Sequence, residues 1–300
     1  MIFLWFLEGL RTPILNQLMQ FVTYFGEGTI AVFIICICYW CINKRFAYLM
    51  GFNFFVSTLL VQSLKIAFRV PRPWVLDPDF KAVDSAISGA TGYSFPSGHT
   101  QSAVCLYFPL ALQVPKNKKG LKALLFFLPL LVAFSRMYLG CHTPADVSVG
   151  FLTAVIFLAL IWHFQDEILD GSKYRKYVTM ALIIISCAVA AYALFLSSQH
   201  VIAGEYAKDS CKAAGAGLGF ACGWYLENTK FHFSTQAKHL WVQVLKVVIG
   251  LILVAVIKGG MAKILGASCI AKFLEYFILV VWILAIYPWI YSHVIKTMED

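Results

Sequence analysis

Three short polar clusters carry residue types suited to phosphate chemistry, and each stands at the end of a long apolar segment. In chain order they are Lys65 with Arg72, then Ser97 with Gly98 and His99, then Arg136 with His142 and Asp146. Arginine grips an oxyanion through two parallel N–H groups and lysine supplies a point charge, so three cations suit a phosphate dianion. A histidine can transfer a proton or attack as a nucleophile near neutral pH. The clusters together predict a site that binds and transfers a phosphoryl group.

The second cluster has the pattern of a helix N-terminus. Ser97 is a favoured N-cap residue directly before an apolar run. Gly98 lets a ligand approach the backbone closely. Free N–H groups and the positive end of the helix dipole then form an anion site, in which His99 would exchange a proton.

The third cluster places a histidine and a carboxylate four residues apart. If a helix begins by Thr143, His142 and Asp146 meet across one turn. Asp146 would then hold one imidazole nitrogen and leave the other free and basic.

Each cluster also has a structural interpretation. Lys65 and Arg72 are long enough to reach the membrane interface as snorkelling side chains. Residues 96–99 can serve only as a turn and cap, and His142 with Asp146 only as a structural pair. The coincidence of three cations, two histidines and a carboxylate favours the chemical interpretation.

The composition indicates the scaffold. The 300 residues are 60% hydrophobic and 13% charged, against about 25% charged in ordinary soluble domains. The chain therefore reads as a multi-span membrane protein. Its net charge of +9 lies in short loops between apolar runs, which is the pattern of a membrane protein and not of a nucleic-acid partner. The nine cysteines show no spacing typical of a zinc site.

Nine apolar segments predict an all-α, polytopic membrane helical bundle. They are residues 29–42, 46–68, 98–114, 121–139, 146–164, 177–198, 211–226, 240–257 and 270–294. Residues 1–28 predict an amphipathic segment at the interface, with a further span as the alternative, and we expect no cleaved signal peptide. The Gly- and Ala-rich segment 211–226 should pack closely against its neighbours.

Lysines and arginines set the expected orientation. They gather after spans one, three and five, at residues 44–45, 116–119 and 173–176. These loops should be cytoplasmic, so the loops after spans two and four, with the polar clusters, face the extracytoplasmic side. Cations kept on that side, such as Lys65 and Arg136, suggest a functional need.

The three clusters together resemble a known signature. It reads Lys65-x6-Arg72-Pro73, Pro96-Ser97-Gly98-His99 and Ser135-Arg136-x5-His142-x3-Asp146, and it resembles that of the type 2 phosphatidic acid phosphatase superfamily. That superfamily includes lipid phosphatases, undecaprenyl pyrophosphate phosphatases, glucose-6-phosphatase and vanadium haloperoxidases. The resemblance implies a six-helix transmembrane phosphatase core over residues 29–200 and about three additional transmembrane helices over residues 201–300.

The resemblance also implies a role for each residue. His142 would attack phosphorus and become a phosphohistidine, Asp146 would orient it, and His99 would protonate the leaving group and then activate water. The phosphoryl oxygens would be held by Lys65, Arg72 and Arg136, with Ser97 and the Gly98 N–H completing the cradle. No metal or other cofactor is implied.

The implied substrate is a lipid phosphate or pyrophosphate whose tail stays in the bilayer of the cell membrane, with residues 75–93 as a lid or headgroup wall. Phosphatidic acid, phosphatidylglycerol phosphate, a sphingoid-base phosphate and undecaprenyl pyrophosphate all fit. Three alternatives are transfer of the phosphoryl group to another acceptor, transport of a phosphate ester, and vanadate-dependent halide oxidation. Mere binding does not need His99, His142 and Asp146, and the known haloperoxidase relatives are soluble.

Overall fold

The computed structural model describes residues 1–237 and 239–295, and the regular elements in these ranges are all helical. The α-helices are α1 (Ile2–Gly9), α2 (Pro13–Tyr24), α3 (Gly28–Ile37), α4 (Lys44–Phe68), α5 (Pro73–Leu76), α6 (Asp84–Ile87), α7 (Gly98–Gln113), α8 (Lys119–Tyr138), α9 (Pro144–His163), α10 (Ser172–Ser198), α11 (Gly204–Leu226), α12 (Leu240–Leu265), α13 (Cys269–Val281) and α14 (Tyr287–Ile290). Short π-helical stretches are Cys38–Ile42, Asp166–Asp170, Glu227–Phe231, Trp282–Ile286 and Tyr291–Ile295. The all-helical class predicted from the sequence is confirmed.

Within the described ranges, six helical stretches are long and apolar enough to cross a membrane. They are Lys44–Leu76, Lys119–Tyr138, Pro144–His163, Lys173–Ser198, Leu240–Leu265 and Cys269–His293. A seventh is counted if Pro13–Tyr24 and Gly28–Ile42, which are bent by 43° at their junction, form one broken span. The chain is therefore a multi-pass membrane protein.

The nine predicted segments are all helical, but two of them fall outside that group of six and the bent pair. Helix α7 has only 16 residues. Helix α11 has 23 residues, with several charged residues near its start and many glycines and alanines after them. Helix α7 is therefore too short, and α11 too polar and too rich in small residues, to be counted with the other spans.

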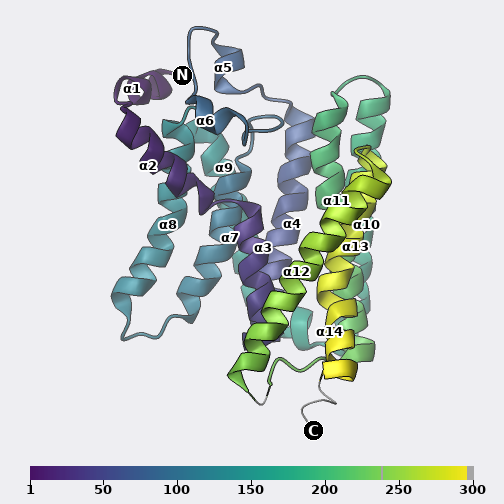
Figure 1. Ribbon diagram of the computed structural model, residues 1–300. Helices are drawn as coiled ribbons and strands as arrows, with labels where there is room; N and C mark the ends of the chain where they lie inside the picture. The colour runs from purple at the N-terminus through teal and green to yellow at the C-terminus, as the bar shows by residue number, and fades with distance from the viewer. Residues whose placement is uncertain (238, 296–300) are drawn as a thin grey trace. The chain divides into compact units, whose positions relative to one another are not determined.

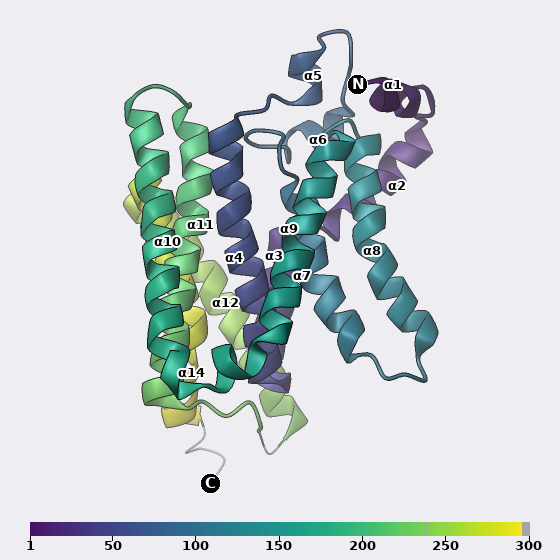
Figure 2. The same ribbon diagram turned by 180° about the vertical axis from the view of Figure 1, so that it is seen from behind.

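The chain divides into two compact units. The first comprises Met1–Val32 and Leu60–Leu160, and the second comprises Phe33–Leu59 and Ile161–Asp300. In the first unit, α7 and α8 form an antiparallel pair, and α1 and α2 pack on α8. The short helices α5 and α6 lie at the end of this unit opposite the turn between α7 and α8 (Figures 1 and 2).

A small apolar core fixes the long connection between α4 and α7. Ala86 and Ala90 of this connection are buried against Tyr138, Leu139 and Cys141 at the end of α8. The backbone N–H of Val83 also donates to the carbonyl of Leu139 at 3.0 Å. The connection is thus packed against the end of α8, and this packing positions the residues before and after it in the chain.

The second unit contains a closely packed helix pair. Helices α10 and α11 run antiparallel (Figure 2), and α11 lies against α13. A Cβ at Gly215 would lie 2.0 Å from the carbonyl oxygen of Phe273, and one at Gly219 would lie 2.6 Å from that of Phe277. Only glycine permits this approach, so the close packing predicted for this Gly-rich segment is confirmed.

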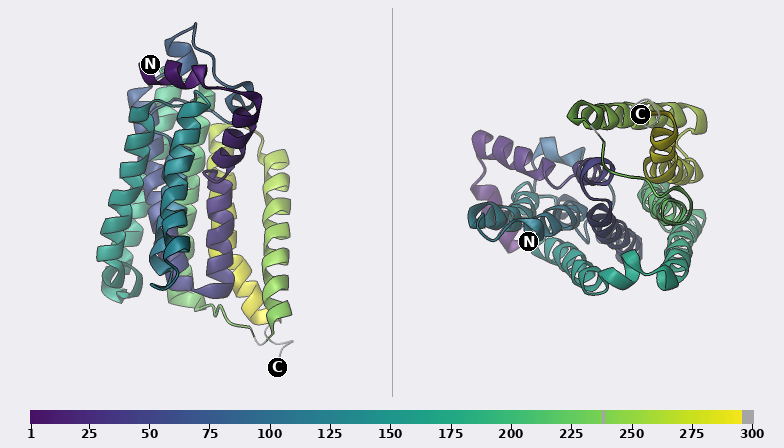
Figure 3. Two further views of the ribbon diagram at one scale, coloured as in Figure 1. Left: turned by 90° about the vertical axis from the view of Figure 1, so that its left-hand side faces the viewer. Right: turned by 90° about the horizontal axis from the view of Figure 1, so that it is seen from below.

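A buried carboxylate ties the ends of several elements of the second unit together. Glu227 is fully buried and accepts hydrogen bonds from Lys44 Nζ at 2.7 Å, Tyr48 Oη at 2.6 Å and the backbone N–H of Phe233 at 2.8 Å. These partners offset the cost of burying its charge. Helix α12 lies at the edge of this unit (Figure 3), with few of its side chains buried.

Candidate active site

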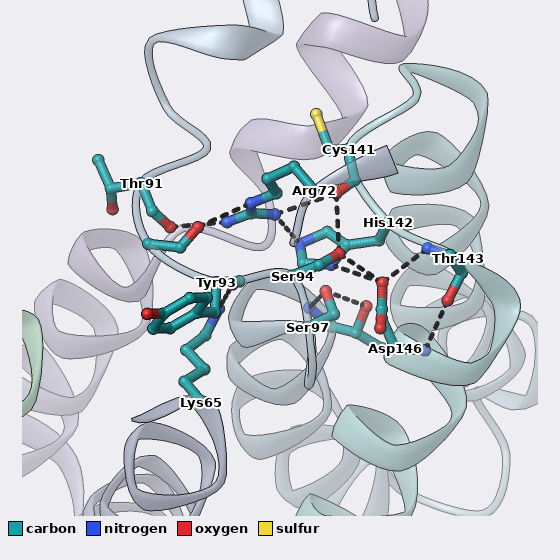
Figure 4. Close-up of polar contacts among 12 residues, drawn as sticks. Lys65, Arg72, Thr91, Tyr93, Ser94, Ser97, Cys141, His142, Thr143 and Asp146 are labelled. Atoms are coloured by element: carbon teal, nitrogen blue, oxygen red, sulfur yellow. Dashed lines mark hydrogen bonds and ion pairs between the residues drawn. The ribbon is translucent and has the colours of Figure 1, made fainter. Parts of the chain in front are cut away.

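The eight residues singled out in the sequence all lie in the first unit, at the ends of its helices. They are Lys65 in the last turn of α4, Arg72 before α5, Ser97 as the N-cap of α7 with Gly98 and His99 in its first turn, Arg136 in the last turn of α8, His142 in the following loop, and Asp146 in the first turn of α9. Most of them are drawn in Figure 4, where they converge from separate elements.

The N-terminus of α7 has the expected cap. Ser97 Oγ accepts from the Thr100 N–H at 3.4 Å and from Thr100 Oγ1 at 3.0 Å. The hydroxyl hydrogen of Ser97 remains able to donate. A Cβ at Gly98 would meet no heavy atom within 4 Å, so the space beside Gly98 is open. A phosphoryl oxygen fits this position, since helix N-termini bind anions.

The first turns of α9 lie directly against this cap. The Ser97 N–H donates to the carbonyl of Asp146 at 2.9 Å. A Cβ at Gly150 would lie 2.4 Å from the carbonyl oxygen of Ser97. A glycine at this position therefore lets α9 bring Asp146 and the preceding His142 up to the mouth of α7.

The three cations are buried. The exposed fractions are 7% for Lys65, 6% for Arg72 and 2% for Arg136. Lys65 Nζ donates to the carbonyl of Tyr93 at 2.5 Å. Burying a positive charge is costly, so a bound phosphate would stabilise all three cations.

Arg72 links the α4–α7 connection to the histidine loop. Its Nη2 donates to the Thr91 carbonyl at 2.6 Å and its Nε to the Gly92 carbonyl at 3.0 Å. Its Nη1 lies 3.0 Å from both the Cys141 carbonyl and His142 Nε2. Because a guanidinium can only donate, Nε2 of His142 must be the acceptor nitrogen. The ring proton is thereby assigned to Nδ1.

Nδ1 of His142 faces Asp146, as the spacing predicted. The distance from Nδ1 to Oδ2 of Asp146 is 3.5 Å, which is ion-pair range and longer than a good hydrogen bond. His142 is 1% exposed. Its burial, and then the positive charges of Arg72 and Arg136, hold its pKa well below the usual 6.5. The imidazole is therefore neutral, with a lone pair on Nε2.

Asp146 is itself held firmly. Its Oδ2 accepts from Ser94 Oγ at 2.6 Å and from the Thr143 N–H at 2.8 Å. The Thr143 hydroxyl accepts in return from the Asp146 N–H at 3.3 Å. Thr143 and Asp146 thus form a capping box at the start of α9. This geometry agrees with a structural role for Asp146 as part of the helix cap, and equally with a role in orienting His142.

Two residues of this constellation carry polar atoms without hydrogen-bond partners among the described residues. They are Nε and Nη2 of Arg136, and Nδ1 of His142. Buried donors are normally paired, so the two Arg136 nitrogens mark a place for an oxyanion ligand, whereas Nδ1 of His142 faces the Asp146 carboxylate. No cluster of three or more His, Cys, Asp or Glu side chains suited to a metal ion occurs within residues 1–237 and 239–295.

Sequence reasoning assigned no role to Ser94 or Thr143. Thr143 stands three residues before Asp146, a capping-box spacing that was open to recognition from the sequence. Ser94 carries no such signal, because its contact with Asp146 spans 52 positions in the chain. The carbonyls that receive Lys65 and Arg72 belong to the backbone and leave no mark in the sequence.

The fold and the site together define a class of protein. It is a polytopic helical membrane protein with a buried, cationic site around a neutral histidine. Residues 46–170 match the PAP2 superfamily, and residues 211–297 match the PAP2 superfamily phosphatase, transmembrane extension. The chain belongs to the PAP2 superfamily, and the resemblance seen in the sequence is confirmed.

Three relatives are phosphatases by name. Phosphatidylglycerophosphatase B of Bacillus subtilis (strain 168) is 27% identical over 168 residues, which cover 53% of this chain and 79% of that protein. Undecaprenyl-diphosphatase BcrC of the same strain is 26% identical over 160 residues, covering 52% and 78%. Sphingosine-1-phosphate phosphatase 1 of Rattus norvegicus is 27% identical over 224 residues, covering 68% of this chain and 50% of that protein. The chain thus spans about half the length of this last relative.

Proposed function

We propose that this protein is an integral-membrane phosphatase that hydrolyses a lipid phosphate or a polyprenyl pyrophosphate through a phosphohistidine at His142. The observation that carries the proposal is the placement of His142. Arg72 fixes its tautomer from one side, and Asp146 Oδ2 lies 3.5 Å from Nδ1 on the other. Nε and Nη2 of Arg136, which have no hydrogen-bond partner in the described part of the chain, complete the constellation. Phosphoryl transfer chiefly needs such positioning and charge stabilisation.

The proposed reaction has two steps. In the first, the Arg72 N–H that is hydrogen-bonded to Nε2 turns to donate to a phosphoryl oxygen while keeping its proton, and the freed Nε2 lone pair of His142 attacks phosphorus. The P–O bond to the leaving group breaks, and His99, which takes up a proton as the anionic substrate binds, gives that oxygen this proton and becomes neutral imidazole. In the second, His99 takes a proton from water, the water oxygen attacks phosphorus, and the P–N bond breaks to release phosphate. Asp146 balances the charge that develops on the imidazole.

The cradle of the proposed site consists of Lys65, Arg72, Arg136, Ser97 and the Gly98 N–H. Their charges offset the dianion, so we propose that hydrolysis needs no metal or other cofactor. We propose that residues 29–200 form the catalytic core, residues 201–300 additional membrane helices, and residues 1–28 an amphipathic segment at the membrane interface.

The names of three relatives support a lipid substrate, since their substrates are phosphatidylglycerophosphate, sphingosine 1-phosphate and undecaprenyl diphosphate. The lysine-rich loops of the sequence support a site on the extracytoplasmic side of the cell membrane. A lipid tail would stay in the bilayer while its head reaches the buried cations.

The test is phosphate release by the purified protein in detergent with EDTA, with these three lipids and phosphatidate as substrates. His142→Asn removes the nucleophile, and His200→Asn serves as the matched control because His200 is exposed in the second unit. We expect release that is lost in the first variant and kept in the second. Release that requires added magnesium, or that survives His142→Asn, would refute the mechanism. If the phosphoryl group is found on an added alcohol and not in free phosphate, phosphotransfer would be favoured instead.

A further inference from the structure

We infer that Thr23, in the last turn of α2, is a positioning residue that orients Arg136 for the phosphoryl group. The inference rests on the proposed function. It gives the N-terminal segment a part in the site that neither the three polar clusters nor the matched family region 46–170 contains.

The contact itself joins two buried groups. Arg136 Nη1 donates to Thr23 Oγ1 at 3.2 Å, across 113 positions of the chain. Thr23 and Arg136 are each 2% exposed. A hydroxyl has two acceptor lone pairs and a guanidinium has none, so Thr23 must accept in this pair. Desolvation makes the contact stronger than one at the surface.

The choice of nitrogen matters for chemistry. The contact uses Nη1 of Arg136, whereas Nε and Nη2 have no partner among the described residues. Nε–H and one N–H of Nη2 point in parallel from one edge of the planar guanidinium, which is the edge that grips two oxygens at once. By holding Nη1, Thr23 fixes the plane of the fork and leaves this edge for the phosphate.

Two further features place the end of α2 at the site. A Cβ at Gly26 would lie 2.8 Å from the carbonyl oxygen of His99 and 2.6 Å from Cγ1 of Val132. The C-terminal end of a helix carries partial negative charge, which favours a cation beside Thr23. The turn after α2 is therefore packed against the acid–base histidine and the helix that bears Arg136.

The test compares a substitution that removes the Thr23 hydroxyl with one that keeps it. Thr23→Val keeps the branched shape and removes the acceptor, whereas Thr23→Ser keeps the acceptor and removes a methyl group. We expect Thr23→Val to lower kcat/KM for lipid phosphate hydrolysis about tenfold to a hundredfold, because the bond involves a charged group. Thr23→Ser should retain most of the wild-type value.

A double variant separates positioning from packing. If Thr23 acts through Arg136, adding Thr23→Val to Arg136→Lys should cost little more than Arg136→Lys alone. If the fold-losses in kcat/KM of the two single variants multiply in the double variant, the inference is overturned. Equal losses of kcat/KM in Thr23→Val and Thr23→Ser would overturn it as well. Wild-type kcat/KM in Thr23→Val would overturn it too, and would leave the proposed function intact.

A second readout does not need turnover. Inorganic phosphate should raise the melting temperature of the wild type and of Thr23→Ser, and raise that of Thr23→Val less. If the wild type hydrolyses none of the lipids, the proposed function fails, and this shift still decides the role of Thr23. An equal shift in both variants would refute that role.

Discussion

Gly150 lies outside the predicted set of chemical residues, yet replacing it with alanine should damage the site severely. A Cβ at Gly150 would lie 2.4 Å from the Ser97 carbonyl oxygen and 3.3 Å from the Ser97 carbonyl carbon and nitrogen. An ordinary contact needs about 3.4 Å, so α9 and the cap of α7 must separate by about 1 Å. Both contacting groups are backbone, and no flexible side chain can yield instead.

The displacement acts on catalytic geometry. Ser97 precedes His99, and α9 carries Asp146, so the separation moves the acid–base histidine away from the nucleophile. A misplacement of about 1 Å can cost about 100-fold in rate. We therefore expect Gly150→Ala to lower kcat about 100-fold, with a smaller change in KM.

The assay is initial-rate phosphate release, normalised to monodisperse protein, with the melting temperature measured beside it. Gly120→Ala is the matched control, because Gly120 lies in the first turns of α8 with nothing within 4 Å of its Cβ position. The control should match the wild type in rate and gain slightly in stability through helix propensity. Wild-type kcat in Gly150→Ala would refute the close approach of α9 to the α7 cap.

Two further predictions concern the histidine. Ser94→Ala removes the 2.6 Å bond to Asp146 Oδ2, and should lower both kcat/KM, about tenfold, and the melting temperature, because a buried carboxylate oxygen loses a donor; an unaltered rate would show that Thr143 alone holds the carboxylate. The pKa of His142 lies well below 6.5, so its imidazole is still neutral at pH 6.5. The acid limb of the pH profile of kcat/KM, corrected for titration of the substrate, should therefore lie below pH 6.5. Arg72→Gln removes the nearest positive charge and should move this limb upward; an acid limb near 6.5 in the wild type would contradict the burial of His142.

The helical framework was open to prediction because it rests on local signals. The apolar run 121–139 corresponds to α8, and the run beginning at Leu240 corresponds to α12, which extends to Leu265. Ser97 caps α7 as its residue type and position indicated. The Gly-rich segment packs closely, since small side chains dictate the approach of helices.

The supporting contacts of the site were not open to prediction in the same way. Thr23 meets Arg136 and Ser94 meets Asp146 through single hydroxyls far apart in the chain. A hydroxyl within an apolar or mixed segment has no periodicity that reveals its partner. The expectation of an interfacial segment over residues 1–28 likewise gave no reason to place the end of α2 beside Arg136.

The central claim is a covalent phosphoryl group on His142. The most direct measurement is rapid alkaline quenching of the enzyme during turnover of a lipid phosphate, followed by mass spectrometry of the peptide that contains residue 142. The account predicts a phosphorylated His142 that appears within the first turnover, disappears after substrate is exhausted, and is absent from His142→Asn. Burst-free turnover with no phosphorylated His142 at any time, or phosphorylation on another residue, would contradict it.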